Sequence, residues 1–285
     1  METPSHRVGA GLDDPDAFLR LACLSYSDDD RARVTRAIDL LARDPELSTA
    51  TIFAAAATGA VEALHALLAA DPGAAVRDGG PHRWPPLLYL CFGRVPDDPP
   101  ARSTLESARL LLAAGAEVNA GFLWQGLAPP FTALTGAFGG GENRLNQPPH
   151  QHSPELARLL LEAGADPNDG QALYNRMFEP ADDHLRLLFE FGLGSGDGGP
   201  WRRRLGAAQQ TPKVMLEDQL LWAVSAGRTG RVQLLLQHGV DPDGRGSGHP
   251  THGGRFPYET AVRDGRREIA DLLVAAGSRR QAPAE

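Results

Sequence analysis

The segment Ser107–Asn119 reads SARLLLAAGAEVN, and Leu156–Asn168 repeats it as LARLLLEAGADPN, 49 residues further along the chain. The two copies match at nine of thirteen positions. In each copy apolar residues recur at helical spacing, and the run ends at a glycine, which easily adopts the left-handed backbone of a helix end. Each copy therefore predicts a short helix that buries one face and stops at the glycine.

Weaker copies of this pattern occur along the rest of the chain. They are VQLLLQHGVDPD at Val232–Asp243, IADLLVAAG at Ile269–Gly277, LRLLFEFG at Leu185–Gly192, ALHALLAAD at Ala63–Asp71 and RAIDLLARD at Arg36–Asp44. A shorter helical segment precedes each copy. Where a glycine separates the two segments, it stands 12 residues before the closing residue. Self-similarity of this kind is typical of repeat proteins.

Two short antiparallel helices, a glycine turn and an LLxxGAxxN exit resemble the ankyrin repeat, a unit of about 33 residues. The opening motif of that family, T-P-L-H-x-A, is matched loosely, for example by TALTGA at Thr132–Ala137. Repeats can be anchored at Ala17, Ala50, Pro85, Thr132, Gln171, Asp218 and Phe256. The resemblance implies an all-α, ankyrin-type helical solenoid of stacked helix-turn-helix repeats with irregular finger loops. We expect one domain over residues 14–277, between flexible tails at 1–13 and 278–285.

The sequence departs from the family at the histidine of the opening motif. In ankyrin repeats the Thr and His of this motif help to tie neighbouring repeats by hydrogen bonds. Here the histidine position is occupied by Arg20, Phe53, Leu88, Thr135, Tyr174, Leu221 and Glu259. We therefore expect the repeats to be held together by apolar stacking, because one repeat cannot bury its own apolar face.

Composition excludes several classes of protein. A formal net charge of −8 argues against a binder of nucleic acid or of a membrane surface, which needs a basic face. No run of 18 apolar residues predicts a membrane span, and Met1–Asp16 shows no secretory signal. Cys23 and Cys91 are too few for a disulfide framework and are expected in the core. We expect a cytoplasmic monomer, and the near absence of lysine suggests a GC-rich, bacterial type of coding genome.

The surplus length of the repeats falls in loops. Loops within repeats occupy residues 27–33, 94–101 and 141–152, and the fingers between repeats occupy 78–84, 120–131, 193–211 and 244–255. Long loops in a compact array are either functional or merely tolerated. The resemblance implies a non-catalytic interaction module that binds another protein on the concave face formed by the fingers and the inner helices.

Aromatic and basic residues of the fingers are the candidate partner-binding residues, since Trp and Arg are enriched among binding anchors. The candidates are His82, Trp84, Trp124, Trp201, Arg202, Arg203, Arg204, His252 and Arg255. Each finger Trp can instead fix its finger to the neighbouring repeat. The three arginines can instead form a solvated loop or pair with Asp28–Asp30. Trp222 falls within an inner helix and is expected in the core.

The sequence contains no pattern that demands an enzyme or a cofactor. The pairs His150/His152 and His249/His252 are expected at opposite edges of the array, so we predict no metal site. There is no G-x-S-x-G elbow and no P-loop, and the glycine-rich Gly194–Gly199 is interpreted as a flexible finger tip.

Two other functions stay open. The first is an enzyme or a small-molecule-binding protein that uses the long loops to roof the concave groove. The second is an acidic inhibitor or immunity-type protein that masks a basic partner. A strongly salt-dependent association rate would distinguish this second function from apolar capture.

Overall fold

The computed structural model describes residues 14–27, 29–97, 102–143, 145–248 and 254–280. The predicted tail at 1–13 and the end of the second tail, 281–285, lie outside these residues. The chain divides into two compact units, Met1–Ala116 and Glu117–Glu285. The single domain expected over residues 14–277 stays a prediction.

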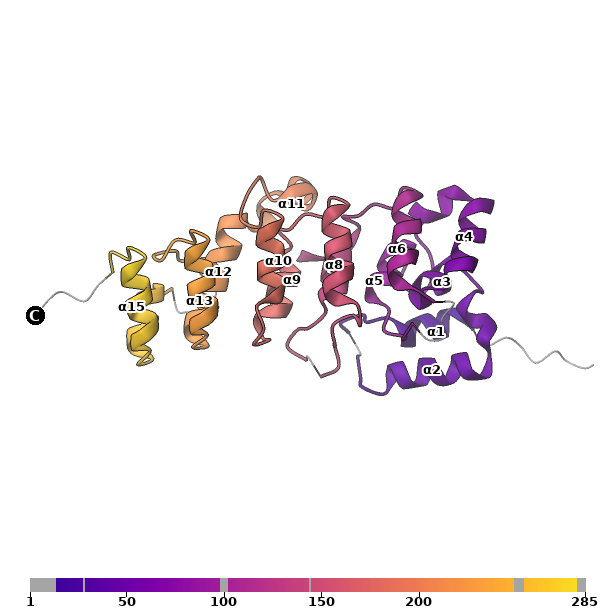
Figure 1. Ribbon diagram of the computed structural model, residues 1–285, viewed down its shortest axis with the longest axis horizontal. Helices are drawn as coiled ribbons and strands as arrows, with labels where there is room; N and C mark the ends of the chain where they lie inside the picture. Colours follow the sequence, from indigo (N-terminus) through magenta and orange to yellow (C-terminus); the bar gives the residue numbers. More distant parts are fainter. Residues whose placement is uncertain (1–13, 28, 98–101, 144, 249–253, 281–285) are drawn as a thin grey trace, which may run out of the picture. The chain divides into compact units, whose positions relative to one another are not determined.

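The first unit contains three helix pairs within its described residues. They are α1 (Pro15–Ala22) with α2 (Arg33–Arg43), α3 (Ile52–Thr58) with α4 (Val61–Ala70), and α5 (Pro86–Phe92) with α6 (Thr104–Ala113). The short 3-10 helices η1 (Pro45–Ser48) and η2 (Pro72–Val76) follow α2 and α4. Figure 1 shows α2 lying across the direction that α4 and α6 share. The first pair therefore departs from the stacking of the next two.

Small residues let the helices of this unit approach closely. The core of α3 is the alanine run Ala54–Ala57, which lies against the buried helix α5. Gly59 ends α3 with a φ of 67°. A Cβ atom there would stand 3.0 Å from backbone atoms of Ser103 and Thr104. Glycine is thus required both by the left-handed backbone and by the close approach of the start of α6.

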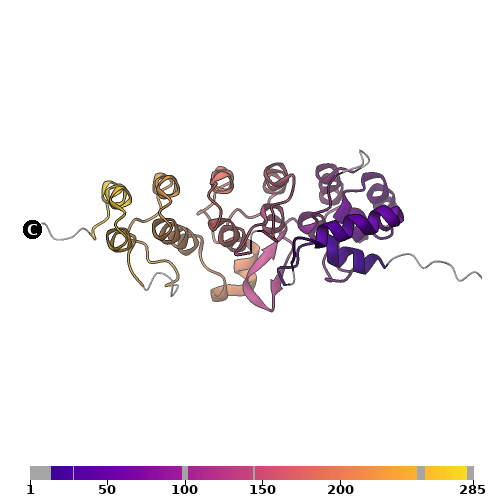
Figure 2. The same cartoon turned by 90° about the horizontal axis from the view of Figure 1, so that it is seen from below.

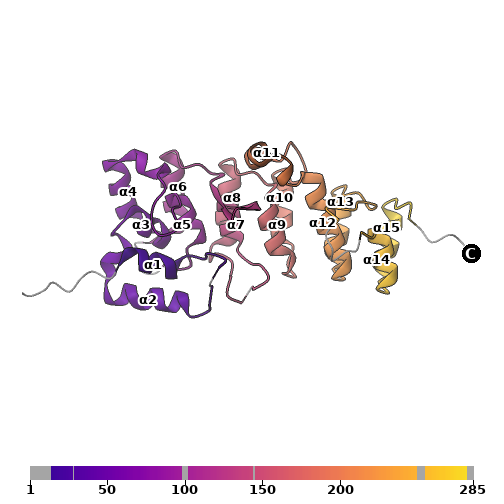
Figure 3. The ribbon, with the colours of Figure 1, turned by 180° about the vertical axis from the view of Figure 1, so that it is seen from behind.

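The second unit contains four helix pairs within its described residues. They are α7 (Ala133–Phe138) with α8 (Ser153–Glu162), α9 (Gly170–Met177) with α10 (Asp183–Glu190), α12 (Pro212–Ser225) with α13 (Thr229–Gln237), and α14 (Pro257–Arg263) with α15 (Arg267–Ala275). In Figures 2 and 3 the first helices of the pairs form one layer and the second helices form another. We call them the inner and the outer helices. The outer helices carry the repeated LL pattern.

Two fingers of this unit contain regular structure that the sequence analysis did not predict. Residues of the 120–131 finger form an antiparallel hairpin of β1 (Gly121–Trp124) and β2 (Leu127–Thr132). The 193–211 finger contains α11 (Gly199–Leu205) and the 3-10 turn η3 (Gly206–Ala208). The glycine-rich tip that we expected to be flexible thus leads directly into a helix.

One buried arginine connects two repeats of the second unit. Arg231 of α13 is 1% exposed. Its guanidinium pairs with Asp182 at 2.5 Å and donates to the carbonyls of Met177, Glu179 and Ala181. These partners lie between α9 and α10 or at their ends, so Arg231 fixes the loop between the two helices of the preceding repeat.

The ordered chain continues past the predicted domain end at residue 277. Ser278 is 2% exposed, and its hydroxyl donates to the Asp243 carboxylate at 2.6 Å. The backbone N–H of Arg279 donates to the same carboxylate at 2.9 Å. Asp243 thereby ties the residues after α15 to the finger that follows α13.

Candidate functional site

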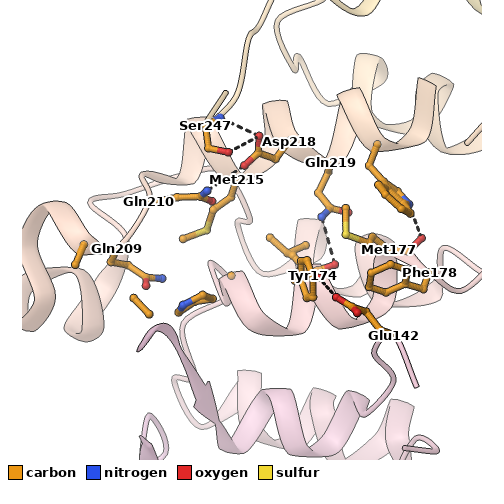
Figure 4. A pocket seen from close by; sticks show the side chains of 16 residues that line it. Glu142, Tyr174, Met177, Phe178, Gln209, Gln210, Met215, Asp218, Gln219 and Ser247 are labelled. Atoms are coloured by element: carbon orange, nitrogen blue, oxygen red, sulfur yellow. Dashed lines mark hydrogen bonds between the residues drawn. The ribbon is translucent and has the colours of Figure 1, made fainter. Parts of the chain in front are cut away.

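A pocket of about 580 Å³ lies in the second unit, between the inner helices α9 and α12 and the fingers (Figure 4). Strand β2 contributes one wall, and residues 208–210 of the α11 finger contribute another. The residues that line it are Ala128, Pro129, Glu142, Gly170, Leu173, Tyr174, Met177, Phe178, Ala208, Gln209, Gln210, Met215, Asp218, Gln219, Trp222 and Ser247. We call this cavity the α9–α12 pocket.

The start of α9 leaves space for the pocket. Asp169 caps the helix by accepting a hydrogen bond from the N–H of Ala172 at 2.9 Å. Gly170 follows as the first helical residue. A Cβ atom at this position would stand 3.4 Å from Met215 Cε and from Pro129 Cβ, on two different walls. A larger residue at position 170 would therefore reduce the cavity.

Three aromatic side chains lie along one side of the pocket. Phe178 makes edge-to-face contacts with Tyr174 and Trp222, with ring centroids 5.3 and 5.2 Å apart. The Trp222 indole N–H donates to the Met177 carbonyl at 3.0 Å, which fixes the ring. Trp222 is half-buried and lines the pocket, so the prediction that it lies in the core is only partly right.

Two carboxylates face the pocket, and their hydrogen-bond partners are neutral. The Tyr174 hydroxyl donates to Glu142. Burial, followed by this hydrogen bond, raises the pKa of Tyr174 to about 12. Asp218 accepts from the Gln210 amide at 3.0 Å and from the backbone N–H of Ser247 at 2.8 Å. No cation of the described chain forms an ion pair with either carboxylate, and none lines the pocket.

Two buried glutamine side chains each leave an acceptor unused. Gln219 is 3% exposed, and its amide N–H donates to the Leu173 carbonyl at 3.2 Å. Gln209 is also 3% exposed, and in Figure 4 its side chain extends into the pocket. In both residues the Oε1 atom is buried without a hydrogen-bond partner in the described part of the chain. Buried oxygens of this kind are uncommon and call for an explanation.

A polar network joins two repeats beside the pocket. The hydroxyls of Thr132 and Thr135 both donate to Asp169, at the start of the next repeat's inner helix. Asp169 is 6% exposed, and burial raises its pKa above the ordinary value. The expectation of purely apolar stacking is wrong at this junction, because Thr135 supplies a hydrogen bond from the position where the family has histidine.

The candidates His82 and Trp84 lie together in the first unit. Their rings are stacked with centroids 4.4 Å apart, and Trp84 is 5% exposed. Burial, followed by the charges of Arg20 and Arg33, lowers the pKa of His82 to about 4. This burial corresponds to the alternative in which the Trp fixes its own finger, and it leaves Trp84 little surface for a partner.

The candidate Trp201 packs inside the second unit. Its indole N–H donates to the Asn119 carbonyl at 2.9 Å, and its ring lies against Gly121 of the hairpin. Trp201 therefore fixes α11 to the neighbouring finger. The candidate Trp124, at the end of β1, is half-buried and pairs with Leu127 across the hairpin.

The three arginines of α11 all have partners within their own finger. Arg202 donates to the carbonyls of Gly206 and Gln209. Arg203 pairs with Asp197 at 3.1 Å, and the Arg204 guanidinium lies 4.9 Å from the Trp201 ring centroid. Arg203 thus has a partner, Asp197, within its own finger; Asp28 of the alternative partner segment lies outside the described residues. Arg203 and Arg204 remain exposed to solvent.

The remaining candidates are in the finger before α14. Arg255 is half-buried next to Phe256. His252 lies outside the described residues, as does His249. The other histidine pair is described: His150 is 4% exposed, and its Nδ1 accepts from the backbone N–H of His152. The described residues contain no group of three or more His, Cys, Asp or Glu side chains that could hold a metal ion.

Sequence reasoning missed the α9–α12 pocket because its residues come from several segments. Tyr174 appeared in the sequence analysis only as a departure from the family motif, and Glu142 only as part of a long loop. A signal was available in α12, where Trp222 and Gln219 are large or polar residues on an inner helix.

The helices in the described part of the chain are all too short or too polar to cross a bilayer.

Comparison with solved structures identifies the fold. The chain is similar to the crystal structure of an ankyrin repeat domain from Acinetobacter baumannii, with a TM-score of 0.51, 21% sequence identity, and 79% of this chain and 97% of that chain covered. The human ASB11 ankyrin repeat domain gives a TM-score of 0.47 at 20% identity, with 81% and 85% covered. No protein-family model and no curated protein matches the sequence. The prediction of an all-α, ankyrin-type helical repeat fold is confirmed.

Proposed function

We propose that the protein is a non-catalytic interaction module that binds another protein through the inner helices and fingers of its second unit. Ankyrin repeat folds generally serve as interaction domains rather than enzymes. The observation that carries the proposal is the α9–α12 pocket, which inner helices and three different fingers build together. An aromatic wall with the exposed Glu142 and the half-buried Asp218 offers both apolar contact and hydrogen bonds to a partner.

The position of Tyr174 allows a direct test. Tyr174 is 39% exposed and lines the pocket, so the photoreactive p-benzoylphenylalanine can replace it without filling the core. Arg186, exposed on the outer helix α10, is the control position. We expect irradiation in a lysate of the source cells to link a discrete polypeptide to position 174 and not to position 186. Equal labelling at the two positions, or no polypeptide at position 174, would refute the proposal.

A small-molecule-binding protein is the second candidate function. A volume of about 580 Å³ falls within the range of about 300–1,000 Å³ that is typical of small-ligand pockets. Native mass spectrometry of gently purified protein tests this function. A constant mass increment that disappears in Gly170→Leu, which fills the pocket, would favour it. An unmodified mass in both proteins would count against it.

A further inference from the structure

We propose that the α9–α12 pocket binds an arginine side chain within an extended segment of the partner protein. This inference rests on the proposed function and specifies the chemistry of its ligand. It is carried by two carboxylates without an ion-pair partner among the described residues and by an aromatic wall in the same cavity.

Charge complementarity selects a cationic ligand. Glu142 and Asp218 both line the pocket, and their hydrogen-bond donors among the described residues are the neutral groups of Tyr174, Gln210 and Ser247. The described lining contains no Lys, Arg or His. A cation entering the cavity would therefore meet two negative charges, the exposed Glu142 and the half-buried Asp218, and its attraction to Asp218 is stronger than in bulk water.

These features together favour arginine over lysine. A guanidinium has five N–H donors, stacks on aromatic rings and is less strongly hydrated than an ammonium group. Tyr174, Phe178 and Trp222 provide aromatic surface, and the two carboxylates provide acceptors. The cavity is larger than one arginine side chain, so the residues flanking the arginine also contact its walls. This is why we infer an extended segment rather than the free amino acid.

Short synthetic peptides test the proposal directly. The probes are three fluorescein-labelled pentapeptides with a central arginine, lysine or citrulline between alanines. Citrulline keeps the shape of arginine but has no charge. We expect the arginine peptide to bind the full-length chain about tenfold or more tightly than the citrulline peptide, with the lysine peptide between them. Fluorescence anisotropy at two salt concentrations measures the affinities.

Matched protein variants locate the binding. Glu142→Gln with Asp218→Asn removes both pocket charges. The controls are Glu155→Gln with Asp241→Asn, which make the same chemical changes at exposed positions away from the pocket. We expect the charge variant to lose about tenfold or more in affinity for the arginine peptide, and the controls to lose less than about twofold. Circular dichroism checks that each variant is folded.

Three results would overturn the inference. They are equal affinity for the arginine and citrulline peptides, equal losses in the pocket and control variants, and no saturable binding of the arginine peptide. The segment cross-linked to position 174 gives an independent reading. A polypeptide captured there through a segment without arginine overturns the inference and leaves the proposed function intact. Failure to capture any polypeptide overturns the proposed function itself.

Discussion

The junction between Thr132, Thr135 and Asp169 yields a stability prediction for the substitution Asp169→Ala. Asp169 caps α9 through the N–H of Ala172, and losing such a cap costs about 1 kcal/mol. The substitution also leaves the buried hydroxyls of Thr132 and Thr135 without their acceptor. Each orphaned donor costs about 1–2 kcal/mol. We expect the free energy of unfolding of the second unit to fall by about 3–5 kcal/mol, a large fraction of the stability of a typical domain.

Urea denaturation followed by circular dichroism measures this loss. Asp241→Ala is the control, because Asp241 also accepts a backbone hydrogen bond, from the N–H of Asp243, but is exposed. The control should lose less than about 1 kcal/mol. In a double-mutant cycle with Thr135→Val, removing the hydroxyl should cost about 1–2 kcal/mol less in the Asp169→Ala protein than in the original protein, because the hydrogen bond from the Thr132 backbone N–H to this hydroxyl is lost in both. Additive losses, or a loss no larger than that of the control, would refute the network.

Three further predictions concern buried polar groups. Arg231→Met leaves Asp182 and three carbonyls without their donor. The free energy of unfolding measured by urea denaturation should therefore fall by about 3–5 kcal/mol, and a fall below about 1 kcal/mol would contradict the role of Arg231 in fixing the α9–α10 loop. Because His82 has a folded-state pKa of about 4, the unfolded chain binds the extra proton first on acidification. The free energy of unfolding should fall as the pH drops from about 6.5, the pKa of histidine in the unfolded chain, towards 4. Thermal melts recorded at several pH values should not show this contribution in His82→Gln. Trp201→Phe removes the hydrogen bond to Asn119, and increased proteolysis within 193–211 should report the release of α11.

The outer helices could be predicted because their signal is local. Helical spacing of leucines and a closing glycine predicted short helices within Ser107–Asn119 and Leu156–Asn168, and the structure has α6 at Thr104–Ala113 and α8 at Ser153–Glu162. Both the periodicity and the stop are properties of a short segment, and seven similar segments reinforce one another. The inner helices were located only approximately, since their opening motifs are degenerate.

The hairpin and the pocket could not be predicted in the same way. Strand β2 reads LAPPFT, and two prolines in six residues indicate a loop, because proline cannot donate to a β-ladder. The pocket depends on Glu142, Tyr174 and Ser247, which come from three separate segments. Their proximity follows from how the repeats stack, and no local pattern encodes that.

The departures from the family's opening motif coincide with the candidate site. Thr135 takes the histidine position and ties its repeat to Asp169. Tyr174 takes the same position one repeat later, yet its hydroxyl reaches the carboxylate of Glu142 in the pocket. The same position of the repeat therefore has two different surroundings. Thr135 holds two neighbouring repeats together, whereas Tyr174 lines a pocket. Under the proposed function, position 174 serves recognition in the α9–α12 pocket, whereas position 135 holds two repeats together.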